Sequence, residues 1–340
     1  MHGPIAFSMP KSVDPRAEPA APHAAPLVGR RPAPDHLGET VVTIPESAGG
    51  PPPAPPDLLV VDPLPDRVGE YEILGLAGSG AMGRVYVARD PRLGRRVAIK
   101  VMSLRAARDP AARRRFLRES RAAAAVEHPH VMTIHQIGAD DGLPFIVMQY
   151  LEGVTLAEHR RAAASFPLRE VLRIGREIAA GLAAAHGRGL VHGDIKPGNV
   201  FLDGVGRSVR IIDFGLARKF GNGPRQAAVP WALGGTPAYM PPERIGGQDT
   251  DGAGDLFGLG LILYELLAGR LPFEGSTVAT MLASIAAGRP QPLREVAPDV
   301  PVAVADLVMR LIAHDKADRP ASAQAVVDAI AALERGLPAA

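Results

Sequence analysis

The sequence contains no cysteine and only one tryptophan. Without cysteine the chain can form no disulfide, no thiolate nucleophile and no cysteine metal site, so we expect no redox chemistry. A chain built without disulfides suits the reducing environment of the cytosol. The absence therefore favours a cytoplasmic protein whose chemistry depends on other side chains.

The sequence also lacks a strong charge of one sign and a long apolar run. Its 38 basic and 36 acidic residues give a formal net charge of +2 without a basic tract, so we expect no nucleic-acid partner. The longest apolar run, residues 256–269, is shorter than the ~20 residues of a membrane-spanning helix and contains Glu265. Residues 1–10 lack the pattern of a secretory signal. We expect no membrane segment, and a buried core helix at 256–269.

Proline is concentrated at the beginning of the chain. Residues 1–66 hold 16 of the 34 prolines, contain few aromatic residues and include the run PPPAPP at 51–56. Such a segment cannot bury enough apolar surface to offset the entropy lost on ordering. We predict a disordered Pro/Ala-rich tail over residues 1–66, a folded domain over 67–335 and a short end over 336–340.

From Tyr71 onward the pattern is first strand-like and then helical. A helix is predicted at 111–126, and apolar, β-branched runs predict strands at 71–77, 85–89, 96–102, 132–137 and 145–150. Past Gly153, periodic segments predict helices at 168–187, 253–268, 278–287, 302–313 and 321–335. The pattern predicts an α+β fold with a small β-rich lobe, about 67–150, and a larger helical lobe, about 151–335.

The most informative residues lie in the segment HGDIKPGN at 192–199 and in the triplet DFG fourteen positions after it. Asp194 and Asn199 are five residues apart on a loop between short strands, so they can converge on one point. Asp213, in a tight turn, can meet them there. This geometry suits one carboxylate beside an acceptor hydroxyl and an Asn/Asp pair that holds Mg²⁺ on a triphosphate. The pattern predicts phosphoryl transfer.

On these motifs the chain resembles the protein kinase family, specifically bacterial (Hanks-type) Ser/Thr protein kinases, from about Tyr71 to about Leu333. The resemblance implies a bilobal protein-kinase fold, protein substrates phosphorylated on Ser or Thr, and the cofactors ATP and Mg²⁺, with Mn²⁺ as a substitute metal. It implies that Asp194 is the catalytic base and that Lys196 lies beside the γ-phosphate. Asn199 and Asp213 would bind the metal through oxygen atoms.

A glycine-rich segment, GSGAMG at 78–83, lies near the start of the expected β-rich lobe. The same spacing opens Rossmann-type βα units. Residues 84–89, however, continue as a strand, which favours a hairpin that covers phosphates. By resemblance, Lys100 grips the α- and β-phosphates and pairs with Glu119. The alternatives are a solvated strand end for Lys100 and an exposed i,i+4 pair for Glu119.

The resemblance assigns further residues to the nucleotide. Met148 would be the gatekeeper, and the backbone at Gln149 and Leu151 would meet the adenine. The full set expected at the nucleotide is Ala77, Gly78, Ser79, Gly80, Ala81, Met82, Gly83, Val85, Ala98, Lys100, Glu119, Met148, Gln149, Leu151 and Phe201. An ordinary core strand explains its apolar members Val85, Ala98 and Phe201 almost as well.

Three further expectations concern structural support, and all of them come from the resemblance. Thr236, in the segment GTPAYMPPE at 235–243, would bond toward Asp194. Glu243 would form a buried ion pair with Arg319. Asp255 would anchor the helix beneath the catalytic loop.

Two rival functions remain open at this stage. The triplet His192-Gly193-Asp194 is typical of small-molecule phosphotransferases such as aminoglycoside and choline kinases, although Lys196 and the Gly-rich hairpin favour a protein substrate. A pseudokinase scaffold is the second rival, since Gly193 and Ala77 depart from the usual pattern. Lys100 and the Asp/Asn set of the site are all present, which favours activity. The sequence predicts no particular oligomeric state.

The sequence also lacks hydroxyl side chains where kinases are often regulated. Residues 216–235 contain no Ser, Thr or Tyr, and Gly193 stands where the family usually has an arginine that binds a phosphate on this segment. We predict that phosphorylation of the segment does not switch the protein on, and that Trp231 orders it by packing or, alternatively, contacts the substrate. In the tail, Thr40, Thr43 and Ser47 are expected phosphorylation sites for phospho-dependent partners, with a solvated linker as the alternative.

Overall fold

The structure is a computed structural model that describes residues 64–80, 83–163, 165–204, 207–214, 218–219 and 237–337. Of the predicted disordered tail, residues 1–63 lie outside the described residues, and so do Trp231, the predicted tail phosphorylation sites and most of the segment between 215 and 236. The described residues belong to one compact unit that begins at Val61.

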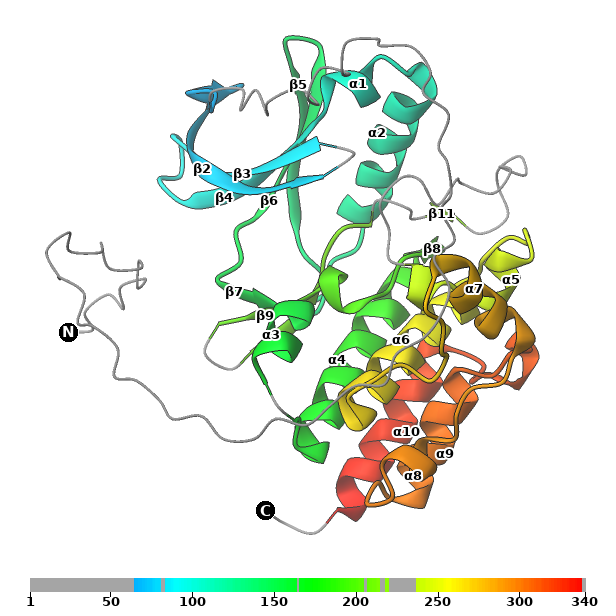
Figure 1. Cartoon of the computed structure of the whole chain (residues 1–340). Helices are drawn as coiled ribbons and strands as arrows, with labels where there is room; N and C mark the ends of the chain where they lie inside the picture. Colours follow the sequence, from blue (N-terminus) through cyan, green and yellow to red (C-terminus); the bar gives the residue numbers. More distant parts are fainter. Residues whose placement is uncertain are drawn as a thin grey trace, which may run out of the picture. The chain divides into compact units, whose positions relative to one another are not determined.

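The β-rich lobe is built on one antiparallel sheet (Figure 1). Its strand order is β1-β2-β3-β4-β6-β5, and the strands are β1 (Arg67–Val68), β2 (Tyr71–Gly80), β3 (Gly83–Arg89), β4 (Arg96–Met102), β5 (Ile134–Asp140) and β6 (Leu143–Gln149). Two helices, α1 (Leu104–Ala107) and α2 (Pro110–Ala124), connect β4 to β5. Asp109 caps α2 and Pro110 occupies its first turn, which is where proline suits a helix.

The two faces of this sheet have different roles, because successive side chains of a strand point to opposite faces. One face forms a small core from Ala88, Val97, Ile99, Phe145 and Val147, together with Val68 and Tyr71 from the first two strands. The register places Val85, Lys100 and Ile146 opposite one another on the other face, followed two residues along by Val87, Ala98 and Met148. The sheet therefore presents a separate row of side chains that the small core does not use.

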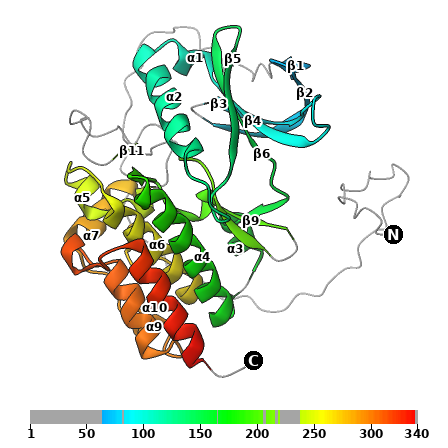
Figure 2. The same ribbon diagram turned by 180° about the vertical axis from the view of Figure 1, so that it is seen from behind.

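The second lobe is mainly helical (Figure 2). Its helices are α3 (Leu156–Ala162), α4 (Leu168–Gly187), α5 (Pro242–Ile245), α6 (Gly252–Ala268), α7 (Val278–Ala287), α8 (Leu293–Val296), α9 (Val302–Leu311) and α10 (Ala323–Gly336). Short pairings add β7 (Gly153–Thr155), β9 (Val200–Asp203) and β10 (Ser208–Ile211) in one small sheet, and β8 (Leu190–Val191) with β11 (Arg218–Lys219) in another. The described residues also include the 3₁₀ turns η1 (Pro197–Asn199), η3 (Pro237–Tyr239) and η4 (Lys316–Asp318).

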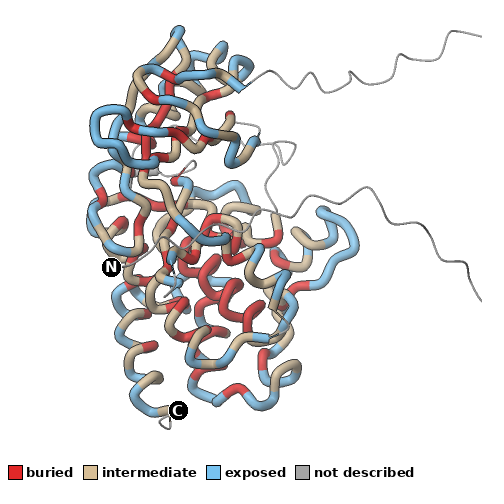
Figure 3. The backbone as a smooth tube through the Cα atoms, turned by 90° about the vertical axis from the view of Figure 1, so that its left-hand side faces the viewer, coloured by how far each residue is buried: buried red, intermediate tan, exposed pale blue. Residues whose placement is uncertain are grey.

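Helix α6 lies at the centre of the larger core. Nearly every residue from Gly254 to Leu266 is buried, and buried residues concentrate in the helical lobe in Figure 3. Glu265 is buried within this apolar helix, where Arg160 lies 3.2 Å away and the Tyr239 hydroxyl donates to it. The expected buried core helix at 256–269 is confirmed. Among the described residues, no helix is both long enough and apolar enough to cross a membrane.

The predicted α+β architecture, with a small β-rich lobe followed by a larger helical lobe, is confirmed. The glycine-rich segment is a hairpin in which Gly80 pairs with Gly83, and the chain continues as β3. A Rossmann-type loop would enter a helix at this point, so the prediction of a hairpin is also confirmed.

Candidate active site

The loop after β8 brings three predicted site residues together. The Lys196 ammonium donates to Asp194 Oδ2 over 2.7 Å, and Asn199 Nδ2 donates to the same oxygen over 3.1 Å and to the Asp194 carbonyl over 2.8 Å. Asn199 belongs to the 3₁₀ turn η1, which folds the loop back so that residues five positions apart meet. The Asp194 carboxylate is therefore oriented by two donors of its own loop.

The peptide groups before Asp194 are held from both sides. Asp255, in the first turn of α6, accepts hydrogen bonds from the backbone N–H groups of His192 (2.9 Å) and Gly193 (2.7 Å). Arg244 of α5 donates from Nη1 to the Gly193 carbonyl over 2.7 Å. The anchoring role expected of Asp255 is thus present. Sequence reasoning missed Arg244, and its only sequence signal is its position next to Glu243.

His192 and Phe214 link this loop to the segment that carries Asp213. His192 is fully buried, its Nε2 lies 3.1 Å from the Ile212 carbonyl, and its ring centroid lies 4.7 Å from that of Phe214. The backbone N–H of Ile212 also donates to the Asn199 carbonyl over 3.0 Å. These contacts hold the two predicted metal-binding residues on adjacent stretches of chain.

Asp213 forms a close ion pair with Lys100, whose Nζ lies 2.5 Å from Asp213 Oδ1. The Asp213 side chain is 46% exposed, yet desolvation by the surrounding protein would by itself raise its pKa. The ammonium of Lys100, followed by His192 and Lys196, outweighs this effect and holds the pKa below its ordinary value. Asp213 has a φ of 60°, a conformation that is uncommon for a residue with a side chain. The carboxylate is therefore kept ionised and aimed at the sheet of the first lobe.

The ion pair expected between Lys100 and Glu119 requires a correction. Among the ion pairs of the described residues, Lys100 pairs with Asp213, and Glu119 lies 3.9 Å from its neighbour Arg118. Glu119 is buried on α2. The cause is geometric, because the position of α2 relative to β4 decides which carboxylate reaches Lys100, and sequence separation does not encode that position.

Four of the residues expected around the nucleotide, Val85, Ala98, Lys100 and Met148, share one face of the sheet. Val85 is opposite Lys100, and Ala98 is opposite Met148, while Phe201 lies on β9 beside Thr155 of β7. Gln149 is the last residue of β6, and Leu151 lies two residues further along the chain. Ala77, Gly78, Ser79, Gly80 and Gly83 all lie in the β2–β3 hairpin, whereas Ala81 and Met82 at its tip lie outside the described residues.

The hairpin has open backbone at two of its glycines. A Cβ added at Gly78 or Gly80 would meet none of the described residues within 4 Å, so the backbone there is open to an approaching group. A Cβ at Gly83 would lie 1.9 Å from the Val101 carbonyl oxygen. Gly83 is thus required for packing of the hairpin on β4, whereas Gly78 and Gly80 leave room above the sheet.

Asn199 and Asp213 fit a hard divalent cation through the chemistry of their donor atoms. Both hydrogen bonds from Asn199 to Asp194 use Nδ2, which turns the amide oxygen away from Asp194, and Asp213 adds a carboxylate. Within the described ranges, no group of three or more His, Asp or Glu side chains gathers to hold a metal. Phosphate oxygens and water would have to complete a six-coordinate Mg²⁺ sphere.

The expected buried ion pair between Glu243 and Arg319 is confirmed. Arg319 donates from Nη1 and Nη2 to the two carboxylate oxygens of Glu243 over 3.0 and 2.9 Å, and both side chains are buried. This bidentate pair ties α5 to the turn after η4. Thr236, which was expected to bond toward Asp194, lies outside the described residues.

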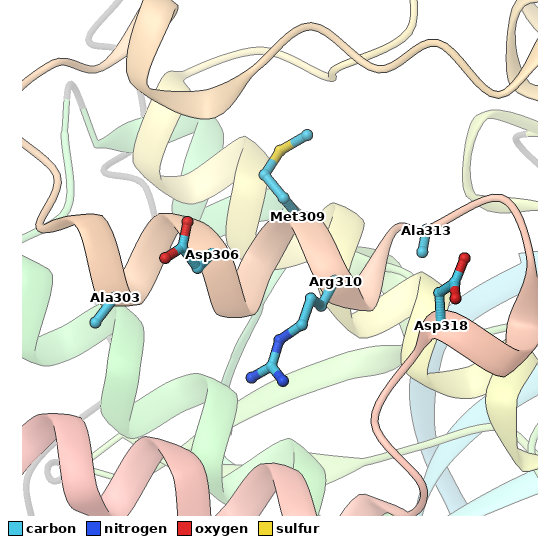
Figure 4. A pocket seen from close by; sticks show the side chains of 6 residues that line it. All are labelled: Ala303, Asp306, Met309, Arg310, Ala313 and Asp318. Carbon is cyan, nitrogen blue, oxygen red and sulfur yellow. The ribbon is translucent and has the colours of Figure 1, made fainter.

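A separate hollow of about 710 Å³ opens on α9, away from this site (Figure 4). None of the predicted site residues contributes to its wall, which consists of Ala303, Asp306, Met309, Arg310, Ala313 and Asp318. The predicted site contacts thus lie elsewhere, in the loop of Asp194 and Asn199 and in the Lys100–Asp213 pair.

Comparison with known proteins gives consistent matches over the described domain. The family model of the protein kinase domain matches residues 71–329. The serine/threonine-protein kinase pkn2 of Myxococcus xanthus is 38% identical over 84% of this chain and 34% of its own length. The serine/threonine-protein kinase PrkC of Bacillus subtilis is 35% identical over 75% of this chain and 39% of its own length. The chain thus spans between a third and two fifths of these curated relatives.

A solved structure has the same fold. The crystal structure of the PknI kinase domain of Mycobacterium tuberculosis matches with a TM-score of 0.63 and 32% identity, covering 79% of this chain and 97% of that chain. The structural similarity to the PknI kinase domain therefore extends over both lobes.

Proposed function

Because this chain belongs to the protein kinase family, we propose that it transfers the γ-phosphoryl group of ATP to serine or threonine of protein substrates. The observation that carries the proposal is the meeting of Asp194, Lys196 and Asn199 in one hydrogen-bonded loop, next to the Lys100–Asp213 pair. Its curated relatives are named serine/threonine-protein kinases.

In this proposal, each residue of the loop has one task. Asp194 orients the acceptor hydroxyl and takes its proton, and Lys196 neutralises charge beside the transferred group. Asn199 and Asp213 would hold Mg²⁺, which neutralises charge on the phosphates when bound. Lys100, which pairs with Asp213 in this structure, would hold the α- and β-phosphates.

The nucleotide would lie on the face of the sheet that the small core leaves unused. Val85, Ala98 and Phe201 would contact the adenine as apolar walls, and the backbone at Gln149 and Leu151 would bond to it beside Met148. The open backbone at Gly78 and Gly80 supports a position of the phosphates beneath the hairpin. We propose a cytoplasmic role in signal transduction, with tail residues Thr40, Thr43 and Ser47 as sites for phospho-dependent partners.

The two rival functions fit these observations less well. A small-molecule phosphotransferase is disfavoured by Lys196, which contacts Asp194, and by the buried Glu243–Arg319 pair that resembles protein kinases. A pseudokinase is disfavoured because Lys100, Asp194, Asn199 and Asp213 are all present. Lys100 pairs with Asp213, and Asn199 donates to Asp194. The kinase assignment therefore remains the preferred one.

The first prediction tests the role of Asp194. Replacing Asp194 by Ala should lower turnover of Mg-ATP on a generic protein substrate by roughly 10²–10⁴-fold, because the carboxylate acts on the hydroxyl. Affinity for ATP should change little, since Asp194 would not hold the nucleotide. Phosphate incorporation is measured by mass spectrometry and ATP affinity by calorimetry. A matched control is Asp203→Ala, on β9 outside the loop; near-normal turnover of Asp194→Ala would refute the role.

We also propose that the segment between Gly215 and Thr236 is not switched by phosphorylation, since residues 216–235 contain no hydroxyl side chain. Phosphatase-treated protein should keep its activity, and mass spectrometry should find no phosphate on residues 213–243 of an active preparation. A preparation that loses activity on dephosphorylation and regains it through a residue in that range would contradict the proposal.

A further inference from the structure

Helix α2 is unusually rich in one kind of charge. It contains a single acidic residue, Glu119, which is buried, and its basic residues are Arg113, Arg114, Arg115, Arg118 and Arg121. The whole chain has a formal net charge of only +2. With five basic residues and one acidic residue, α2 is therefore locally much more positive than the chain as a whole. Its C-terminal end points toward the helical lobe in the ribbon views (Figures 1 and 2).

A hollow of about 420 Å³ opens at that end of α2. Arg118 and Arg121 line it from α2, and Arg188 lines it from the chain between α4 and β8. Its remaining lining residues are apolar, namely Ala122, Ala125 and Leu190. Among the described residues, three arginines and no acidic residue therefore line this hollow.

These guanidinium groups have little compensation from acidic side chains. Arg118 lies 3.9 Å from Glu119, and its own side chain is 67% exposed. In the described part of the chain, neither Arg121 nor Arg188 takes part in an ion pair. Like charges brought together in one hollow repel one another, and a bound anion removes that repulsion. The hollow therefore favours a multivalent anion as its ligand.

We propose that this hollow binds a phosphate group carried by a protein segment. A phosphorylated side chain has a charge of about −1.5 to −2 and three strong acceptor oxygens, which match several guanidinium forks better than a carboxylate does. A hollow of about 420 Å³ also leaves space for residues that flank the phosphate, and Ala122, Ala125 and Leu190 offer them an apolar wall.

Occupation of the hollow has a structural consequence. Arg118 and Arg121 belong to the β-rich lobe, whereas Arg188 belongs to the helical lobe, so one phosphate would join α2 to the second lobe. Glu119 lies next to Arg118 on the same helix, and Lys100 is paired with Asp213 in this structure. Binding would thereby restrict the movement of α2, and of the buried Glu119 that it carries, relative to the second lobe. This regulatory consequence rests on the proposed kinase function, whereas the binding itself does not.

The test is direct binding to the full chain in the absence of ATP. Fluorescence anisotropy compares a labelled phosphoserine peptide with its unphosphorylated twin, and inorganic phosphate serves as a competitor. We expect the phosphopeptide to bind at least about tenfold more tightly than its twin, which corresponds to ~1.4 kcal/mol. Arg121→Ala and Arg188→Ala should each weaken it about tenfold, a loss typical of a charge-assisted hydrogen bond.

The matched control is Arg114→Ala, which removes an exposed arginine from the same helix outside the hollow. It should change the affinity less than about twofold, and circular dichroism confirms that all three variants are folded. An equal loss for Arg114→Ala and Arg121→Ala, or equal affinity for the two peptides, would overturn the site. Inorganic phosphate that binds as tightly as the phosphopeptide would overturn its assignment to a peptide-borne group.

A second readout separates this proposal from the kinase assignment. If the chain is a kinase, saturating phosphopeptide should raise its turnover, and Arg188→Ala should abolish the increase while leaving basal turnover unchanged. Phosphopeptide binding in a protein without turnover would refute the proposed function and leave the anion site standing. Normal turnover without phosphopeptide binding would refute the anion site and leave the proposed kinase function standing.

Discussion

At the scale of single residues, the peptide group of Gly193 is one of the most constrained elements of the site. Its N–H donates to Asp255, and its carbonyl accepts from Arg244, so both ends are fixed by side chains more than fifty residues away. Gly193 has a φ of 76°, a conformation that glycine adopts without strain. The direction in which the chain enters Asp194 is set here, and Arg244 is a positioning residue.

Replacing Arg244 by Ala should lower kcat several-fold to about tenfold with little change in KM for ATP, because the loop loses one of its two anchors while the nucleotide contacts remain. Arg244→Lys should recover part of the loss, since an ammonium can also donate to the Gly193 carbonyl. Steady-state kinetics measures both parameters. The control is Arg294→Ala, an exposed arginine of α8; a loss confined to KM for ATP would contradict a positioning role.

Sequence motifs predict some of these residues better than others. The pairing of Glu243 with Arg319 and the anchoring by Asp255 belong to a pattern of residue types that the family resemblance supplies. The contacts of Lys100 with Asp213 and of Arg244 with Gly193 do not follow from residue types. They depend on distances of a few ångströms between elements far apart in the chain, which motifs leave open.

At the scale of secondary-structure elements, α5 and the turn after η4 are joined by the buried Glu243–Arg319 pair. Arg319 also donates to the carbonyls of Ala313, His314 and Ala253, so its guanidinium connects α6 to the end of α9. Its guanidinium carbon lies 4.9 Å from the centroid of the Phe257 ring. One side chain thus organises the junction of four segments.

Replacing Glu243 by Gln should destabilise the protein by about 3–5 kcal/mol, because the Arg319 charge would stay buried without its counter-charge. Urea unfolding followed by circular dichroism measures the loss. The matched control is Lys316→Met, which breaks a pair with Asp251 whose side chains are 46% and 37% exposed. That loss should be at most about 1 kcal/mol, and equal losses for the two variants would contradict the importance of burial.

Element boundaries could be predicted where the ends carry local signals. Helices α4 and α7 and strand β4 begin and end at the predicted residues. Pro167 precedes α4, and α7 lies between the capping Thr277 and Gly288, which has a φ of 64°. The seven-residue α3 and the four-residue β9 and β10 were not predicted. Segments so short complete too few periods to be distinguished from loops.

At the scale of the whole described domain, two cores of unequal size support the two lobes. The core of the β-rich lobe has seven buried residues, whereas the larger core of the helical lobe draws buried residues from α4, α6 and α9 and from other elements. Phe145 is central to the smaller core, where its ring lies beside Gly69 and Gly138 and packs edge-on against Tyr71. Because a smaller core buries less apolar surface, the β-rich lobe should open first.

Replacing Phe145 by Ala should cost about 3–5 kcal/mol and should act mainly on the β-rich lobe. Hydrogen exchange followed by mass spectrometry should show faster exchange in β3, β4 and β6, with α6 nearly unchanged. The matched variant Phe257→Ala removes a ring from the larger core and should accelerate exchange in α6 instead. Equal acceleration of both lobes by Phe145→Ala would mean that the domain unfolds as one cooperative unit.

The ion pair between Lys100 and Asp213 makes the binding of nucleotide and the binding of a metal ion thermodynamically dependent on each other. Phosphates that draw Lys100 away release the Asp213 carboxylate, and a cation that takes Asp213 releases the Lys100 ammonium. Each event removes the competitor of the other, so metal and nucleotide should bind with positive heterotropic cooperativity beyond their own mutual attraction. Because such coupling is reciprocal, nucleotide must raise metal affinity by the same factor by which metal raises nucleotide affinity.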